Sequence, residues 1–297
     1  PNATHSDQIP QDVWQSASAV LAYDQIKFDQ QLIDQLTSCK AIIRVGVGYD
    51  NVDLEYAKQK GVVVCNIPDY GTEEVADHAI GLLLMLTRGL KEYSRNVENL
   101  DWSRTNDLPV RLRGKTFGVI GLGRIGIATA RRAQVFGLNI VFYDPYVKNG
   151  MHKALGFVQT RSLQMLAEQA DFISIHTPLT DETENILDDS FFKYVKQGCY
   201  LINTARGNLV DIDALEKAMK DNRIKAAGLD VIPIEPNNGS QSLICALEKQ
   251  EDWIKNRLII TPHSAFYSPE AYTEMRSNAA IEALRVLKNT PPLNQVN

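Results

Sequence analysis

Short runs of β-branched and other apolar residues alternate with amphipathic stretches from Ala41 onward. This alternation is typical of a parallel β-sheet flanked by helices. The apolar runs predict strands over residues 19–22, 41–45, 62–66, 116–120, 140–143, 172–175, 199–202, 226–229 and 258–260. The amphipathic stretches predict helices over residues 29–37, 73–99, 125–137, 162–168 and 211–221.

Two helical segments and one loop have further features. The stretch over 73–99 is apolar nearly all round its middle, so we expect it to be buried. The C-terminal helix has a clear start, with Ser268 as N-cap, Pro269 at the first helical position and Glu270 in the first turn. Residues 237–241 predict a polar loop.

The segment from Thr116 to Asp144 joins two predicted strands through a glycine loop and a helix. Gly121 permits a tight turn, Gly123 lets a pyrophosphate approach the backbone, and Gly126 lets the helix lie close to the strand. Asp144 ends the second strand, where a carboxylate accepts hydrogen bonds from a ribose 2′-OH and repels a 2′-phosphate. A glycine loop can also be a plain turn, but the order of these parts favours a dinucleotide site for NAD rather than NADP.

The glycine loop lies more than a third of the way along the chain, which predicts two domains. We expect an α/β fold in which a Rossmann domain, a doubly wound parallel sheet over residues 95–267, binds NAD. We expect it to be inserted into a smaller, flavodoxin-like α/β substrate domain formed by residues 1–94 and 268–297. A ligand cleft is expected between the two lobes.

Composition and charge exclude several functions. A net charge of −5 without a Lys/Arg cluster gives no basic field for nucleic acid, and the longest apolar stretch, 79–86, is too short to cross a bilayer. The four cysteines are widely spaced, without CxxC or a nearby His at ligand spacing, so we expect reduced thiols in a cytoplasmic protein and no metal. No secretory signal opens the chain, although its start at Pro1 without a methionine is also compatible with removal of a leader.

Three ionisable residues follow predicted strands on the C-terminal side of the glycine loop: Arg206, Glu235 and His263. Loops at the carboxyl ends of parallel strands open onto the cofactor crevice, so these side chains can converge there. The Arg206 guanidinium can hold a carboxylate and polarise a carbonyl, and His263 can exchange a proton with that carbonyl oxygen. Glu235 can orient the imidazole and favour its protonated form.

Each of these residues also has a purely structural interpretation. A lone His is often a hydrogen-bonding structural residue, a lone Arg a surface ion pair, and a Glu before Pro part of a turn. Their joint position on three neighbouring loops favours catalysis. His176, which follows another strand, is assigned a structural role on the cofactor side, and the remaining histidines, at positions 5, 78 and 152, have no comparable context.

A second glycine-rich turn follows the strand over 41–45. The backbone N–H groups of Val47 and Gly48 can form a small anion nest for a substrate carboxylate. An ordinary strand-to-helix turn explains the same glycines equally well. Tyr70 lies in the next loop and can reach the same cleft.

With these residues in place, the chain resembles the D-isomer-specific 2-hydroxyacid dehydrogenases. The resemblance extends over residues 42–287 through the segments RVGVGYDNVD, IPDYGTEEVADHAIGLLL, GKTFGVIGLGRIG, HTPLTDETENIL, LINTARGNLVD, AAGLDV and TPHSAFYSPEA. Within the family it is most similar to the branch of the C-terminal-binding-protein (CtBP) corepressors, through FYDPY, NTARG, EP and PHSAFYS.

The resemblance implies the family's catalytic arrangement on Arg206, Glu235 and His263, and a homodimer joined through the cofactor domain. It implies cofactor contacts at Thr72, Gly121, Gly123, Arg124, Ile125, Gly126, Asp144, Thr177, Pro178, Thr183, Thr204, Ala205, Asp230 and Ala265. It implies substrate contacts at Val47, Gly48, Tyr70, Arg206 and Phe266.

Three departures from the family pattern modify these expectations. The corepressors carry a tryptophan where this chain has Phe266, so their substrate preference is not transferable. Glu235 argues against formate dehydrogenases, which have glutamine there. The family has a further strand and helix before the segment that opens at Pro1, so we expect either a trimmed N-terminus or an unusually small first lobe.

The sequence therefore predicts an NAD-dependent oxidoreductase that interconverts a small 2-keto acid and a D-2-hydroxy acid. The alternative is an NAD(H)-sensing, corepressor-like binding protein with little turnover. Because the N-terminal segment that forms the corepressors' partner cleft is lacking, we favour the enzyme. Neither nucleic acid nor membrane is an expected partner.

Overall fold

The computed structural model describes residues 5–104, 109–235 and 241–297. It divides the chain into two compact units, one formed by Pro1–Gly71 with Tyr267–Asn297 and the other by Thr72–Phe266. The second unit is thus inserted into the first, as expected. Residues 72–94, which we predicted to belong with the chain ends, group with the second unit, and most of the predicted polar loop over 237–241 lies outside the described residues.

The second unit contains a parallel sheet that, within the described residues, has seven strands in the order β10-β9-β8-β7-β4-β5-β6. In chain order these are β4 (Thr116–Ile120), β5 (Asn139–Tyr143), β6 (Val158–Gln159), β7 (Phe172–Ile175), β8 (Cys199–Asn203), β9 (Ile224–Leu229) and β10 (Leu258–Ile260). The chain runs from β4 outward to β6 and then returns to β7 on the other side of β4. This change of direction creates the topological switch point at which such sheets bind ligands. The expected doubly wound α/β fold is confirmed.

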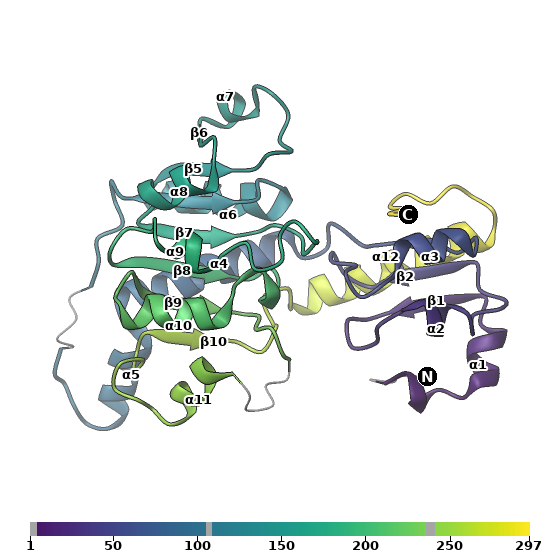
Figure 1. Cartoon of the computed structure of the whole chain (residues 1–297), viewed down its shortest axis with the longest axis horizontal. Coiled ribbons are helices and arrows are strands. Elements are labelled where there is room, and N and C mark those ends of the chain that lie inside the picture. Colours follow the sequence, from purple (N-terminus) through teal and green to yellow (C-terminus); the bar gives the residue numbers. More distant parts are fainter. Residues whose placement is uncertain (1–4, 105–108, 236–240) are drawn as a thin grey trace. The chain divides into compact units, whose positions relative to one another are not determined.

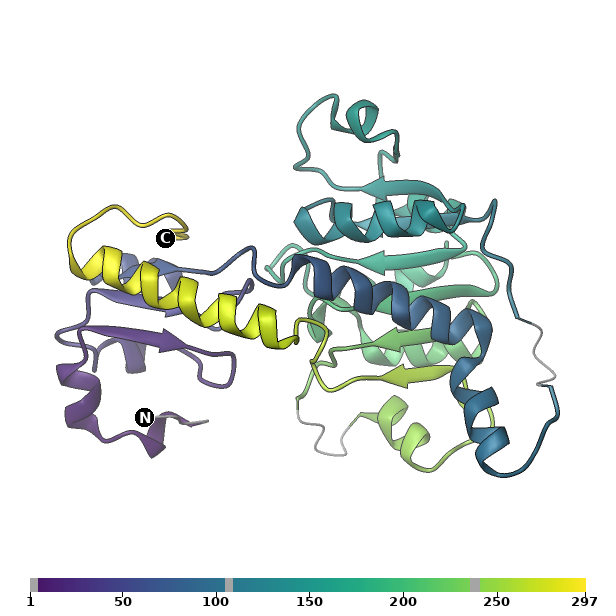
Figure 2. The same cartoon turned by 180° about the vertical axis from the view of Figure 1, so that it is seen from behind.

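Helices cover both faces of this sheet, as Figures 1 and 2 show from opposite sides. One face packs against α4 (Thr72–Arg88) and α6 (Arg124–Val135). The other packs against α8 (Leu163–Gln169), α9 (Asp189–Phe192), α10 (Ile212–Lys220) and α11 (Ser242–Glu248). Because both faces are covered, strands such as β7 and β8 are buried along their whole length.

The helix predicted over 73–99 is interrupted. Gly89 has a φ of 64° and separates α4 from α5 (Leu90–Glu98). The left-handed backbone at this glycine ends one helix and redirects the next, which contributes no buried residue. Helix α4 packs against α6, β8 and β9, which is why it belongs to the second unit.

The first unit has a smaller parallel sheet, in which the described residues form three strands in the order β1-β2-β3: β1 (Ala19–Ala22), β2 (Ala41–Arg44) and β3 (Val63–Cys65). Its helices are α1 (Gln11–Ser16), α2 (Gln30–Ile33), α3 (Leu54–Gln59) and the C-terminal α12 (Pro269–Leu287), which packs on β1 and β2. Ser268 caps α12 by accepting a hydrogen bond from the Ala271 amide, as predicted. Residues after α12 return to β3, where Gln295 forms an antiparallel bridge with Cys65.

Candidate active site

Three loops at the carboxyl ends of neighbouring strands carry the predicted catalytic residues. Arg206 follows β8, Glu235 follows β9 and His263 follows β10. These strands are adjacent in the sheet, so their loops emerge at the same edge. All three residues lie in the second unit.

Glu235 and His263 form a direct pair. Oε2 of Glu235 lies 2.8 Å from Nδ1 of His263, and its Oε1 accepts a hydrogen bond from the Ile232 amide at 2.8 Å. With one oxygen held by its own loop and the other on the imidazole, the carboxylate fixes the ring orientation. The side chains remain about one third exposed, at 33% and 30%, so the pair can be reached from solvent.

The loop that bears Arg206 is shaped by a buried asparagine. Asn203, the last residue of β8, is 1% exposed. Its Oδ1 accepts from the Ala205 amide at 3.0 Å and its Nδ2 donates to the Arg206 carbonyl at 2.8 Å. The guanidinium donates through Nη1 to the Ala205 carbonyl at 2.8 Å, which holds one terminal nitrogen of the guanidinium near its own loop.

Gly207 brings the Arg206 loop against the Glu235 loop. A Cβ at this glycine would lie 2.0 Å from the carbonyl carbon of Ile232. Only a residue without a side chain allows this approach, because two backbones meet there. Gly207 and Asn203 could not be recognised from the sequence, because their roles depend on contacts that local pattern does not reveal.

Asp230 anchors the loop that presents His263. This residue is 1% exposed, and its carboxylate accepts from the amides of Ser264 and Ala265 at 2.9 and 2.8 Å and from Thr261 Oγ1 at 2.5 Å. His263 itself has a φ of 50°, in the left-handed region, and its amide donates to the Asp230 carbonyl at 2.9 Å. The loop that presents His263 is therefore built around one buried carboxylate.

The glycine loop after β4 has the features expected of a phosphate-binding turn. Gly121 has a φ of 88° and lies so close to the β7 loop that a Cβ would meet His176 carbonyl carbon at 2.8 Å. A Cβ at Gly126 would lie 2.1 Å from the Gly121 carbonyl oxygen. Gly123 is the N-cap of α6, without a side-chain cap, and a Cβ there would meet open space. Uncapped N–H groups of Arg124 and Ile125 thus begin the helix beside an open approach.

Asp144 connects this loop to the end of β5. Its Oδ2 accepts from the Leu122 amide and its Oδ1 accepts from the Tyr146 amide, both at 2.8 Å. The carboxylate is held next to the glycine loop, where an adenosine ribose is expected. A cavity of about 640 Å³, within the size range of ligand sites, is lined by Asp144 and by the residues around β6.

Two buried hydroxyls support the fit of a dinucleotide. Oγ1 of Thr177 and Oγ1 of Thr204 are inaccessible and form no hydrogen bond within the described residues. They lie in the loops after β7 and β8, and buried polar atoms without partners are uncommon unless a ligand completes them. Together with the uncapped N-terminus of α6 and the Asp144 carboxylate, these two hydroxyls fit NAD, the predicted cofactor.

The other predicted cofactor residues occupy the same unit in different roles. Thr183 donates through its hydroxyl to the Pro178 carbonyl at 2.7 Å and thereby closes the loop after β7. Thr72 is the first residue of α4, and Ala265 is 4% exposed. His176 hydrogen bonds through Nε2 to Ser174 Oγ at 2.9 Å, and burial lowers its pKa to about 4, so the ring is neutral near pH 7. The geometry is compatible with its predicted structural role.

The predicted substrate residues are divided between the units. Phe266 lies in the second unit, where its ring contacts that of His263 edge-on with centroids 6.4 Å apart. Val47, Gly48 and Tyr70 lie in the first. Among the residues that the structure describes, no acceptor pairs with the amides of Val47 and Gly48, as an anion nest requires.

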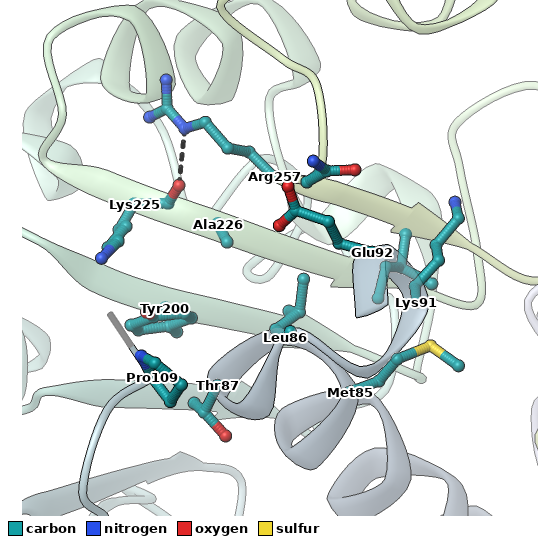
Figure 3. A pocket seen from close by; sticks show the side chains of 13 residues that line it. Met85, Leu86, Thr87, Lys91, Glu92, Pro109, Tyr200, Lys225, Ala226 and Arg257 are labelled. Atoms are coloured by element: carbon teal, nitrogen blue, oxygen red, sulfur yellow. Dashed lines mark hydrogen bonds between the residues drawn. The ribbon is translucent and has the colours of Figure 1, made fainter. Parts of the chain in front are cut away.

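A second cavity in this unit, about 50 Å³, lies at the opposite end of the sheet (Figure 3). It is bordered by the end of α4 and the first residues of β8 and β9. Arg257 lines it, but this guanidinium donates to the carbonyls of Lys225, Trp253 and Met219 and so has a structural role.

Across 5–104, 109–235 and 241–297 no group of three or more His, Cys, Asp or Glu could hold a metal ion. No described helix is long and apolar enough to span a membrane.

Comparison with known proteins identifies the family. A model of the D-isomer specific 2-hydroxyacid dehydrogenase NAD binding domain matches residues 80–265. D-3-phosphoglycerate dehydrogenase of Methanocaldococcus jannaschii is 35% identical over 91% of this chain and 50% of its own length. The chain thus spans about half the length of this curated relative.

Solved structures give the same result. D-lactate dehydrogenase from Aquifex aeolicus, crystallised with NAD and lactic acid, has a TM-score of 0.85 and 32% identity over 98% of this chain and 90% of that one. An NADPH-dependent glyoxylate/hydroxypyruvate reductase from Sinorhizobium meliloti has a TM-score of 0.86 and 31% identity over 99% and 88%. The predicted resemblance is confirmed at the level of the family, and the match supports NAD as the cofactor, whereas the corepressor branch stays a prediction. The chain belongs to the D-isomer-specific 2-hydroxyacid dehydrogenase family.

Proposed function

We propose that this protein is an NAD-dependent dehydrogenase that interconverts a 2-keto acid and a D-2-hydroxy acid. The observation that carries the proposal is the Glu235–His263 pair, held at 2.8 Å on loops at the ligand-binding edge of the sheet. A carboxylate-oriented imidazole is the group needed to exchange a proton with a substrate oxygen. Family membership supports the same reaction class.

The chain's own residues then have distinct tasks. When bound, the nicotinamide supplies or accepts the hydride. His263, through the ring nitrogen opposite Glu235, gives a proton to the carbonyl oxygen or removes one from the hydroxyl. Glu235 stabilises the charged imidazole at Nδ1, and Arg206 binds the substrate carboxylate and polarises the carbonyl. The Gly121–Gly126 loop would hold the pyrophosphate, and Asp144 the ribose hydroxyls.

We assign substrate contacts in the first unit to Val47, Gly48 and Tyr70. Backbone amides bind a carboxylate without adding a net charge, which suits a small anionic substrate. Phe266 beside His263 presents an apolar ring to the substrate side chain. The substrate class is therefore a small 2-keto or 2-hydroxy acid.

A keto-acid panel tests this function. NADH oxidation should be measured with glyoxylate, pyruvate, hydroxypyruvate and phosphohydroxypyruvate, with kcat/KM for each. We expect saturable turnover with at least one of them. Tight NADH binding without turnover of any would contradict the proposal and favour the NAD(H)-sensing alternative.

We further propose a homodimer joined through the cofactor-binding unit. Large apolar side chains are exposed near α5, including Leu100 at 86% and Trp102 at 82%, and such groupings mark protein interfaces. The double substitution Leu100→Glu/Trp102→Glu should convert the dimer into a monomer. Light scattering measures this change as a fall in the molecular mass in solution. Leu293→Glu, also largely exposed at 68% but in the first unit, is the matched control. A wild-type protein that is monomeric at micromolar concentration would contradict the proposal.

A cytoplasmic location is also proposed. Cys39, Cys65 and Cys199 are buried thiols, and no disulfide joins any of the four cysteines, all of which lie in the described ranges. Thiols kept in this state are typical of a reducing compartment. Recovery of the protein in a secreted or periplasmic fraction would contradict this assignment.

A further inference from the structure

A polar chain links helix α4 to the loop that carries His263. His78 on α4 places Nε2 2.9 Å from Oγ1 of Thr261, and that oxygen lies 2.5 Å from Oδ1 of Asp230. Nε2 of His78 is itself 3.6 Å from the same carboxylate oxygen. The sequence pattern indicates no role for His78, because its partners are more than 150 residues away in the sequence.

The chemistry of the three side chains fixes which atom donates in each of these hydrogen bonds. An ionised carboxylate accepts hydrogen bonds and donates none. The Thr261 hydroxyl must therefore donate its single proton to Asp230. Its oxygen can then only accept from His78, so Nε2 of His78 carries a hydrogen.

The loop that these hydrogen bonds hold, residues 261–265, has an unfavourable backbone conformation. His263 has a φ of 50°, and a left-handed conformation costs a non-glycine residue conformational free energy. The cost is offset by hydrogen bonds to the buried Asp230, whose side chain is fully inaccessible. The Ser264 amide and the Thr261 hydroxyl both donate to Oδ1 of this carboxylate, and the Ala265 amide donates to Oδ2.

We propose that His78 is a positioning residue for His263. By donating to Thr261, it holds the hydroxyl in the rotamer that ties Asp230 to both ends of the 261–265 loop. The imidazole that exchanges the proton is thus placed by a second imidazole that does not contact substrate. This proposal rests on the proposed function, since it assumes that His263 is the proton-transfer group.

The kinetic test compares His78→Phe with His78→Gln. Phenylalanine fills the space without a donor, whereas the glutamine amide can still donate to Thr261. One hydrogen bond contributes about 1–1.5 kcal/mol, so we expect His78→Phe to lower kcat about tenfold with KM for the keto acid changed by less than about twofold. His78→Gln should recover most of the loss.

Asp77→Asn is the matched control, because Asp77 is the neighbouring residue on α4 and pairs instead with Arg132 on α6 at 2.6 Å. It should leave kcat unchanged. If His78→Gln is as impaired as His78→Phe, the donor is not what matters and the proposal is wrong. Wild-type kcat in His78→Phe would equally overturn it.

A second readout does not depend on turnover. Hydrogen exchange of the Ser264 and Ala265 amides reports how firmly Asp230 holds the loop. We expect faster exchange of these two amides in His78→Phe, and wild-type exchange in His78→Gln and Asp77→Asn. Unchanged exchange in His78→Phe would refute the positioning role even if no keto acid is turned over, so the two proposals fail separately.

Discussion

Replacing His263 by alanine should lower kcat by about 10²–10⁴-fold, the usual loss when a general acid/base is removed. The side chain exchanges the proton that accompanies hydride transfer, and no other imidazole is positioned by Glu235. The Kd for NADH, measured by fluorescence, should stay within about twofold, because the pyrophosphate and ribose contacts are assigned to the Gly121–Gly126 loop and to Asp144. Stopped-flow NADH oxidation with the best keto acid of the panel provides the rate.

Glu235→Gln is the companion variant. Glutamine can still contact Nδ1 but lacks the negative charge that stabilises the protonated ring, so kcat for NADH oxidation should fall below the wild-type value. An alanine variant of His263 that turns over at the wild-type rate would show that another group transfers the proton. Unchanged thermal unfolding in both variants would exclude loss of fold as the cause.

Replacing Asp144 by alanine should reduce the preference for NADH over NADPH about 10–100-fold in kcat/KM. Hydrogen bonds from ribose hydroxyls to a carboxylate contribute about 1.5–3 kcal/mol, and each 1.4 kcal/mol is about tenfold. The carboxylate also repels a 2′-phosphate, so its removal lowers affinity for one cofactor and raises it for the other. Parallel titrations of both cofactors at saturating keto acid measure the ratio.

Asp171→Ala is the matched control for this substitution. Asp171 also accepts from a backbone amide, that of Thr116 at 2.8 Å, but at the amino end of the same sheet. Its loss should affect stability and leave the cofactor ratio unchanged. An Asp144→Ala enzyme with the wild-type ratio would mean that the ribose is bound elsewhere.

Much of the fold could be predicted because hydrophobic patterning determines it locally. Strands β4, β7 and β10 begin and end at the predicted residues, since each is a short apolar run bounded by polar ones. Strand β6 was missed because both its residues are exposed, which leaves no apolar pattern. The sequence around Gly89 predicts a continuous helix, whereas the positive φ of this glycine depends on the tertiary structure.

The site residues that could be predicted from the sequence are those with reactive side chains that also follow a predicted strand. Glu235 and His263 could be paired from sequence because each follows a strand and their functional groups are complementary. Asn203, Gly207 and His78 were not recognised, since their roles arise from contacts with residues distant in the chain. Motifs thus identify the residues of the site that have reactive groups, while the residues that orient them emerge only from the folded chain.

The two backbone amides that hold Asp144 have an evolutionary consequence. The N–H groups of Leu122 and Tyr146 both donate to the carboxylate, so a shorter residue at 144 would leave a pair of convergent donors at the place to which we assign the ribose. Such a pair is itself a receptor for phosphate oxygens. A single codon change could therefore turn a site that repels the 2′-phosphate into one that attracts it, and lineages with opposite cofactor preference can diverge without rebuilding the loop.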